Sequence, residues 1–225
     1  MAHKPSVKMV GIFGAKRSGK STGAKKDFIN KIMNQSNVFG GFIFDTLDEY
    51  DGEAGFKRAG SLKEVINLVK NGWNNGFKIA YAPPKGDRVK QLNDFCDLIL
   101  KIMRPYYDGK DTRQILLVVE ELNESFPNSG GANLPKGADG FGELCSRGGH
   151  YGVNVIGLAQ RPAEVHGRFR GQLDTIRSYR LAFLPDIKTI ESMLPRGENF
   201  DFFNLEAHHF VQIEGSTITT GVNKL

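Results

Sequence analysis

Residues 14–22 constrain the fold of this chain more than any other stretch. They fit the phosphate-loop pattern, in which two glycines enclose four residues and are followed by Lys and then by Ser or Thr. The stretch reads Gly14, Ala15, Lys16, Arg17, Ser18, Gly19, Lys20, Ser21 and Thr22. An apolar, strand-like run precedes it at 7–13, and 23–29 reads as the first turns of a helix. In this setting the loop N–H groups form an anion nest at a helix N-terminus, so the sequence predicts that the loop binds nucleotide phosphates.

Two side chains of this loop have distinct expected roles. Lys20 is expected to reach the β and γ phosphates of the nucleotide. Ser21 is expected to hold Mg²⁺ through its hydroxyl, because this cation prefers hard oxygen ligands and keeps most of its waters. A nucleoside triphosphate and Mg²⁺ are therefore the expected cofactors.

A pair of carboxylates follows a second apolar stretch, which is a Walker B pattern. Residues 115–119 read Ile-Leu-Leu-Val-Val, typical of a strand buried on both faces, and Glu120 and Glu121 come directly after it. Successive strand residues point to opposite faces, so the two acids have different expected roles at the carboxyl edge of the sheet. We assign Glu120 to Mg²⁺, directly or through water, and Glu121 to polarising the water that attacks the γ phosphate.

Strand-like and helix-like segments alternate through most of the chain, which predicts a parallel sheet covered by helices on both faces. Expected strands lie at 37–45, 77–82, 114–119, 153–160 and 179–184, and expected helices at 61–70, 91–104, 141–147 and 187–194. Alternating residues at 210–220 predict a C-terminal β-hairpin that closes a sheet edge. The expected fold is therefore α/β, a P-loop NTPase with a mainly parallel central sheet flanked by helices. The length of 225 residues fits a single domain spanning 1–225.

Gln160 ends the expected strand at 153–160, beside the strand that bears Glu121. Its amide is therefore expected to sense the γ phosphate or the attacking water. Several arginines follow within 161–180, opposed only by Glu164 and Asp174: Arg161, Arg168, Arg170, Arg177 and Arg180. This density suits contacts with phosphates, and it suits a solvated basic face equally well.

Two loops each allow two interpretations. Asp45, Asp48 and Glu49 close the expected strand at 37–45 and lie either near the nucleotide and its metal or in a solvated acidic loop, which is the commoner outcome. Residues 128–142 are rich in glycine, which is typical of a functional or disordered loop. Lys136 is the only basic residue there, so we expect it to reach a polyanion without gripping it alone.

The composition bounds the class of protein. The formal net charge of +5 permits a polyanionic partner without requiring one. Cys96 and Cys145 lack the spacing of a zinc site, so buried thiols are expected rather than a metal site or a disulfide. The histidines from His150 onward also lack metal-ligand spacing. No stretch reaches the ~18 apolar residues of a membrane-spanning helix, which favours a soluble, intracellular protein.

Taken together, these features resemble the FtsK-HerA superfamily of P-loop ATPases, which pump or translocate nucleic acid. The resemblance rests on the loop at 14–22, the pair Glu120-Glu121, the stretch 146–152 that contains Arg147, and the stretch 155–162 that contains Gln160. It covers residues 7–184. With no added DNA-reading or membrane domain, the chain is most similar to the genome-packaging ATPases of tailless icosahedral viruses with an internal membrane.

The resemblance implies an ATPase that couples ATP hydrolysis to translocation of double-stranded DNA into a preformed capsid. It implies a ring of identical subunits, usually a hexamer, with ATP between neighbours and DNA in the channel, and with capsid vertex proteins as further partners. An arginine of the adjacent subunit then neutralises charge on the γ phosphate. Arg147 is the candidate, and Arg177 and Arg180 are alternatives. The implied location is the host cytoplasm and the packaging vertex of the virion.

Two other classes of protein stay open. A P-loop kinase of a nucleoside or another small metabolite needs an acceptor pocket and an arginine-bearing lid, and the arginines at 161–180 resemble such a lid. The pair Glu120-Glu121 and Gln160 favour activation of water over transfer to a bound hydroxyl. A nucleotide-dependent assembly switch hydrolyses slowly and moves nothing. Stimulation of hydrolysis by nucleic acid separates a motor from a switch.

Overall fold

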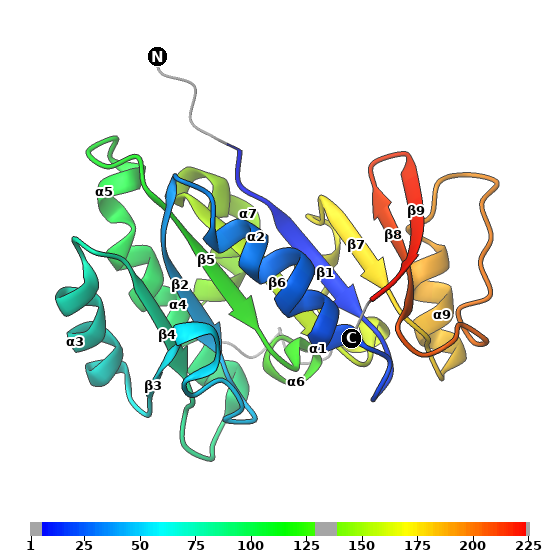
Figure 1. Cartoon of the computed structure of the whole chain (residues 1–225), viewed down its shortest axis with the longest axis horizontal. Coiled ribbons are helices and arrows are strands. Elements are labelled where there is room, and N and C mark those ends of the chain that lie inside the picture. The colour runs from blue at the N-terminus through cyan, green and yellow to red at the C-terminus, as the bar shows by residue number, and fades with distance from the viewer. Residues whose placement is uncertain (1–5, 129–138, 224–225) are drawn as a thin grey trace.

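A twisted sheet crosses the molecule in the computed structural model, which describes residues 6–128 and 139–223. In these residues the sheet has nine strands in the order β3-β4-β2-β5-β6-β1-β7-β8-β9 (Figure 1). The strands are β1 (Met9–Phe13), β2 (Val38–Phe44), β3 (Lys57–Ala59), β4 (Phe77–Tyr81), β5 (Gln114–Val119), β6 (Val153–Ala159), β7 (Thr175–Ser178), β8 (His209–Glu214) and β9 (Thr217–Val222). Strands β1 to β7 pair in parallel, and β8 and β9 are antiparallel. The α/β fold with a mainly parallel sheet and a C-terminal hairpin is therefore confirmed.

Helices cover both faces of this sheet. They are α1 (Lys20–Gly23), η1 (Ala24–Ile29), α2 (Asn30–Met33), η2 (Glu53–Gly55), α3 (Leu62–Gly72), α4 (Arg88–Ile102), α5 (Arg104–Tyr107), α6 (Leu122–Ser125), α7 (Gly140–Tyr151), η4 (Pro162–Glu164), α8 (Gly167–Arg170) and α9 (Leu184–Glu191). The first three form one unbroken helix whose middle segment, η1, is π-helical. This helix packs on one face, whereas α3, α4 and α7 pack on the other (Figure 1).

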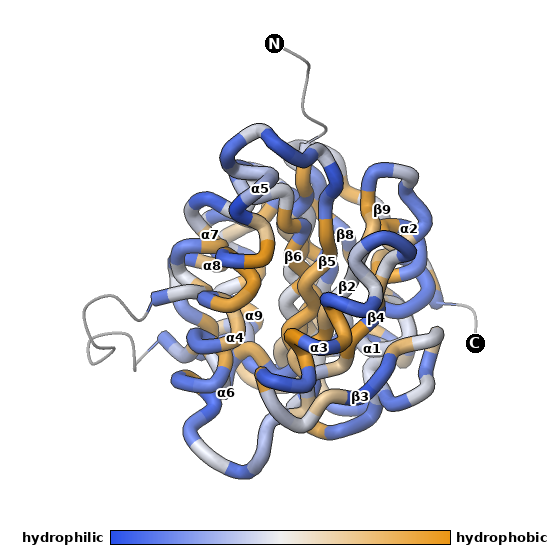
Figure 2. The backbone as a smooth tube through the Cα atoms, turned by 90° about the vertical axis from the view of Figure 1, so that its left-hand side faces the viewer, coloured by the Kyte–Doolittle hydropathy of each residue, from blue (hydrophilic) through white to orange (hydrophobic). Residues whose placement is uncertain are grey.

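The central strands are buried on both faces. Every residue of β1, β5 and β6 is buried, which explains why these segments read as nearly continuous apolar runs. Figure 2 shows the apolar residues gathered along the middle of the molecule. Each fully buried large apolar side chain stabilises the fold by about 1.5–3 kcal/mol, so these strands form a rigid base for the loops at their ends.

The prediction of a strand at 179–184 is wrong. The strand in this region is β7, Thr175–Ser178, which pairs with β1 on one side and β8 on the other. Tyr179 still donates its N–H to Phe13 O at 2.8 Å, and the chain then leaves the sheet. The apolar residues after Tyr179 favoured a strand in the sequence, but of residues 181–184 only Leu181 is buried, and Phe183 and Leu184 are exposed. The short strand β3 was not predicted.

Two helices have different limits from those expected. α9 begins at Leu184 because Pro185 lies in its first turn, where the missing N–H of proline costs no intrahelical bond. α7 runs to Tyr151 rather than ending near Arg147. Gly152 then adopts a left-handed φ of 69°, the usual way in which glycine ends a helix.

Cys96 and Cys145 are free and buried, as the sequence predicts. Burial raises the pKa of both thiols, which keeps them protonated at neutral pH. Within 6–128 and 139–223, no helix is both long and apolar enough to cross a membrane.

Candidate nucleotide and metal site

Residues 14–19 connect β1 to α1 at the carboxyl edge of the sheet, and residues 20–22 begin α1, so the motif joins a strand to a helix as the sequence predicts. The loop begins between two neighbouring strand ends: Gly14 donates its N–H to Ala159 O at 3.2 Å, and Ala15 donates its N–H to Arg180 O at 2.8 Å. Gly19 has a φ of 100°, in the left-handed region that only glycine enters without strain. The loop therefore turns tightly over the end of β1 and directs its N–H groups inward.

A cavity of about 380 Å³ opens beside this loop. The loop lines it with residues 15–22, and the other lining residues are Leu47, Glu49, Glu121, Gln160 and His208. Lys20 is buried, while Ser21 is exposed to the cavity. Ser18 Oγ is buried and has no hydrogen-bond partner within the described residues. A buried cation and an orphaned hydroxyl at a helix N-terminus fit the phosphates of a nucleotide, and the Ser21 hydroxyl fits a bound Mg²⁺.

Glu121 and Gln160 meet at this cavity. β5 and β6 pair with Val119 opposite Gly157, so the residues that follow the two strands project from the same edge of the sheet. Gln160 Nε2 donates a hydrogen bond to Glu121 Oε1 at 2.8 Å. Glu121 has a left-handed φ of 45°, which costs a residue other than glycine about 1–2 kcal/mol. Such strained backbone is typical of functional sites, so the geometry supports a chemical role for this carboxylate.

Glu120 is held by a residue on the loop after β2. Its Oε1 accepts a hydrogen bond from the Tyr50 hydroxyl, and both side chains are buried. Burial raises the pKa of Glu120, while the positive charge of Lys20 and the Tyr50 hydrogen bond oppose the rise. In the described residues Glu120 is not part of the cavity lining, unlike Glu121. This arrangement suits a contact with Mg²⁺ through water better than direct coordination.

The acids that follow β2 have three different environments. Asp45 is buried, and its Oδ2 accepts the N–H of Tyr50 at 2.9 Å. Asp48 pairs with Arg58 at 2.7 Å on the surface, and this partner lowers the pKa of the aspartate. Glu49 lines the cavity. Only Asp48 therefore matches the solvated acidic loop considered from the sequence, and Asp45 instead fixes the backbone at Tyr50.

Arg147 lies on the surface of α7 and does not line the cavity of its own chain within the described residues. Its Nη1 pairs with Glu143 Oε1 at 3.1 Å, and its side chain is 58% exposed. It is seven residues from the start of α7, or ~10 Å along the helix axis. It is therefore open to a neighbouring molecule and separate from the cavity beside the phosphate loop of its own chain.

Most of the arginines between 161 and 180 are ion-paired, so they do not form a free basic face. The pairs are Arg161 with Glu164 and Asp186, Arg168 with Asp139, and Arg177 with Asp27. Arg177 is also 5% exposed, and its guanidinium lies 3.8 Å from the ring centroid of Phe210. Arg180 is exposed beside the phosphate loop. Lys136 lies outside the described residues.

Sequence reasoning missed three residues that contact this site: Tyr50, His208 and Asn223. Tyr50 lies in the loop after β2, at the edge of the sheet where ligands bind, and this position was the only available signal. His208 was considered only as a metal ligand. Asn223 Nδ2 donates a hydrogen bond to Gly19 O at 3.0 Å, a contact between the two ends of the chain that no local pattern predicts.

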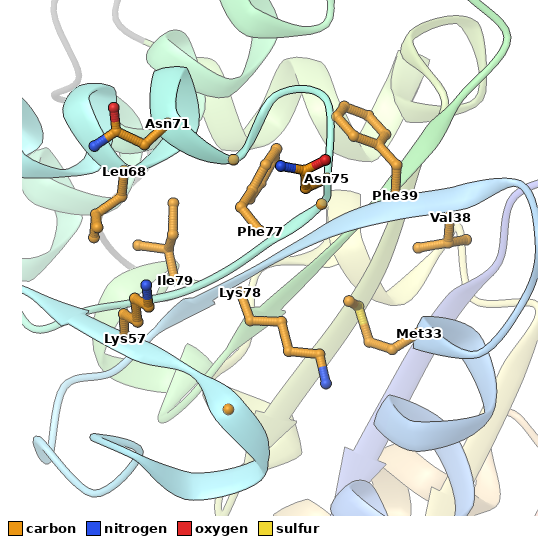
Figure 3. Close-up of a pocket in the computed structure, with 13 residues that line it drawn as sticks. Met33, Val38, Phe39, Lys57, Leu68, Asn71, Asn75, Phe77, Lys78 and Ile79 are labelled. Atoms are coloured by element: carbon orange, nitrogen blue, oxygen red, sulfur yellow. The ribbon is translucent and has the colours of Figure 1, made fainter.

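A larger cavity of about 500 Å³ lies at the opposite edge of the sheet, where β2 and β4 begin (Figure 3). Apolar side chains such as Phe39, Phe77 and Ile79 line it together with Lys57 and Lys78. Lys78 Nζ already donates to Ala54 O at 2.9 Å. The cavity lies at the amino ends of the strands, away from the phosphate loop and both glutamates. Its larger volume therefore does not make it the reaction site.

No protein-family model matches this chain, and no curated protein matches it. Solved structures share its fold. The genome packaging NTPase B204 from Sulfolobus turreted icosahedral virus 2, in complex with AMPPCP, superposes with a TM-score of 0.72 at 18% identity, covering 97% of this chain and 98% of that chain. EssC (ATPases 2 and 3) from Geobacillus thermodenitrificans gives a TM-score of 0.57 at 10% identity, covering 96% of this chain and 39% of that one. The fold implied by the FtsK-HerA resemblance is thereby confirmed.

Proposed function

We propose, from a fold shared over the whole chain with a genome packaging NTPase, that this protein is an ATP-driven translocase of double-stranded DNA. Its proposed task is to package a viral genome into a preformed capsid. One observation carries the enzymatic part of the proposal. Glu121, hydrogen-bonded to Gln160, faces the same cavity as Lys20 and Ser21. A water-activating carboxylate opposite a phosphate loop suits hydrolysis of a nucleoside triphosphate.

Each residue of the site has its own proposed role in hydrolysis. The loop N–H groups and Lys20 bind the β and γ phosphates, which places the terminal phosphorus near Glu121. Ser21 would hold Mg²⁺ through its hydroxyl, and Glu120 would contribute to the same site through water. Bound Mg²⁺ supplies positive charge that offsets the charge developing on the phosphate oxygens. Glu121 polarises the attacking water, and Gln160 fixes the carboxylate by holding Oε1.

The assembly part of the proposal is a ring, usually hexameric, with DNA in its channel. Arg147 of one subunit then reaches the γ phosphate bound by its neighbour, which suits its exposure and its absence from the cavity lining of its own chain. The further proposed partners are capsid vertex proteins, and the proposed location is the host cytoplasm and the virion. Arg161, Arg168 and Arg177 are each held by an ion pair. This favours the translocase over a kinase, which needs a mobile lid that bears arginines.

Steady-state ATP hydrolysis with and without double-stranded DNA tests this function. We expect hydrolysis that DNA stimulates, and we expect Lys20→Ala to abolish it because the triphosphate loses its buried cation. Lys31→Ala is the matched control, since Lys31 is an exposed lysine of α2 outside this cavity. A normal rate in Lys20→Ala would contradict the phosphate-loop assignment. A basal rate that DNA leaves unchanged would identify a switch, and transfer of phosphate to a small hydroxyl acceptor would identify a kinase.

A further inference from the structure

The two ends of the C-terminal hairpin rest on the phosphate loop. His208, just before β8, donates its N–H to Ser18 O at 2.9 Å. Asn223, just after β9, donates its side-chain N–H to Gly19 O at 3.0 Å and to the Tyr179 hydroxyl at 2.8 Å. The two ends are joined to each other, because Asn223 also donates its backbone N–H to His208 O at 2.9 Å. The hairpin therefore fixes both the loop and the residue that precedes β8.

The His208 imidazole leaves one edge for a ligand. Its Nδ1 is buried and has no hydrogen-bond partner in the described part of the chain. A Cβ atom placed on Gly19 would lie 2.7 Å from this nitrogen, so the Nδ1 edge of the ring faces the loop. The residue also lines the nucleotide cavity. The opposite ring edge carries Nε2, and the residue as a whole is only half-buried, so this edge is the candidate for contact with a bound molecule.

The backbone at His208 is held in an uncommon conformation. Its φ is 66°, in the left-handed region that only a small fraction of non-glycine residues adopt, with His, Asn and Asp the more frequent among them. The two backbone hydrogen bonds, to Ser18 O and from Asn223 N, hold the residue in place. Strain of this kind persists where the surrounding structure over-determines it, which is typical of ligand-binding positions.

The strand order shows which end of a nucleotide His208 meets. β1, which carries the loop, has β6 and β5 on one side and β7 and β8 on the other. Gln160 and Glu121 lie on the first side, and His208 lies on the second. When the γ phosphate is beside Glu121, the phosphate chain crosses the loop and its nucleoside end lies toward His208.

We propose that His208 binds the nucleoside end of the nucleotide, at the ribose, through its Nε2 edge. Asn223 is the positioning residue that holds the hairpin on Gly19. The ligand class is a nucleoside di- or triphosphate, and the contact carries no preference for a particular base. The inference rests on the proposed function, because it requires the γ phosphate to lie beside Glu121.

Isothermal titration calorimetry with ATP, ADP and inorganic tripolyphosphate, each with Mg²⁺, tests this role. His208→Gly and His208→Asn remove the imidazole and accept the left-handed backbone, so the contacts with Ser18 and Asn223 persist. We expect both variants to bind ATP and ADP about tenfold more weakly, which is the loss expected for one ligand hydrogen bond. We expect them to bind tripolyphosphate as the wild type does, since this ligand has no nucleoside end.

His209→Ala is the matched control. Its imidazole neighbours His208 in sequence, but its Nδ1 lies 3.7 Å from Glu206 Oε2 and the residue does not belong to the described cavity lining, so we expect unchanged binding. Equal losses for tripolyphosphate and ATP in the His208 variants would show that the imidazole only shapes the loop and would overturn the inference. Unchanged ATP binding would overturn it as well, with the proposed function intact. A wild-type chain that binds neither ATP nor tripolyphosphate would overturn the proposed function and this inference together.

Discussion

Gln160 Nε2 and Glu121 Oε1 lie 2.8 Å apart and join the ends of two adjacent parallel strands. The hydrogen bond engages one oxygen of the carboxylate and leaves the other oxygen for a water. Because Glu121 begins α6 in a left-handed conformation, its side chain leaves the strand at an angle that β5 alone would not give. This hydrogen bond therefore holds the two side chains together at the cavity.

Substitution of Glu121 by Gln is expected to separate binding from hydrolysis. The amide keeps the size of the side chain but cannot accept a proton, so ATP binding should persist while kcat falls by about a hundredfold or more. Binding of a fluorescent ATP analogue and single-turnover hydrolysis measure the two effects. Glu120→Gln is the comparison, and it should change the Mg²⁺ requirement instead. The roles of the two acids are reversed if Glu120→Gln is the variant that binds normally and hydrolyses slowly.

Tyr50→Phe is expected to act on the metal site through Glu120. Removing the hydroxyl deprives the buried carboxylate of a donor that lowers its pKa, so burial then raises the pKa of Glu120 further. A higher pKa means that more of the carboxylate is protonated at a given pH. The acid limb of the pH–rate profile should move to higher pH, and half-maximal activity should need more Mg²⁺. Tyr107→Phe, an exposed tyrosine on α5, should match the wild type in both titrations. Identical Mg²⁺ and pH dependence in Tyr50→Phe would remove Tyr50 from the site.

Arg147→Ala is expected to bind ATP and to lack hydrolysis, because a finger from a neighbouring subunit contributes roughly a thousandfold or more without holding the nucleotide in its own chain. Mixed with Lys20→Ala, it should regain activity. The intact loop of the Arg147→Ala subunit can then face the intact Arg147 of the Lys20→Ala subunit. ATPase assays on co-purified mixtures measure the rescue.

The alternative arginines serve as comparisons in the same assay. Arg180→Ala should complement only if Arg180 is the finger. Arg177→Ala should lower stability first, because it leaves Asp27 without its partner and removes the cation from the ring of Phe210. Lys20→Ala is mixed with each arginine variant in turn, and co-assembly is verified. If every mixture stays inactive, the trans-arginine mechanism is excluded.

Binding of double-stranded DNA should depend steeply on salt and little on sequence. The slope of log affinity against log salt is expected to be about 0.9 per phosphate neutralised, which fluorescence anisotropy measures over a salt series. Lys136→Ala should lower DNA-stimulated hydrolysis and spare the basal rate. Lys110→Ala, an exposed lysine after α5, is a suitable surface control. DNA that neither binds nor stimulates at low salt would favour the switch or kinase alternatives.

Local patterns predicted the parts of this molecule that local interactions determine. The phosphate loop and the all-apolar strand before Glu120 each depend on contiguous residues, and both occur where the sequence places them. Gln160 was also placed correctly, because parallel neighbouring strands end at one edge. The prediction of a strand after Tyr179 failed because the apolar residues there do not form a buried run: Leu181 is buried, whereas Phe183 and Leu184 are exposed.

Sequence patterns did not predict contacts between residues that are far apart in the chain. The arginines after Gln160 read as a basic face, but the partner of Arg177 is Asp27, on the helix that follows the phosphate loop. The hydroxyl that holds Glu120 comes from Tyr50, and nothing in the sequence around either residue indicates the pair. A single sequence gives residue types and spacing, whereas these pairings depend on how the strands are ordered in space.

The bond between Asn223 and Gly19 O spans 204 positions of the chain, which has a consequence for biosynthesis. When β1 to β7 have been synthesised, the whole nucleotide-binding motif is present. Ser18 O and Gly19 O still lack the hydrogen bonds that the hairpin later provides. Such a long-range contact forms late, because loop closure over many residues carries a high entropy cost. On the proposed function, nucleotide stabilises by mass action the chains in which the hairpin has docked on the loop more than those in which it has not. Nucleotide would therefore favour subunits with a docked hairpin over those without one, before any ring is built.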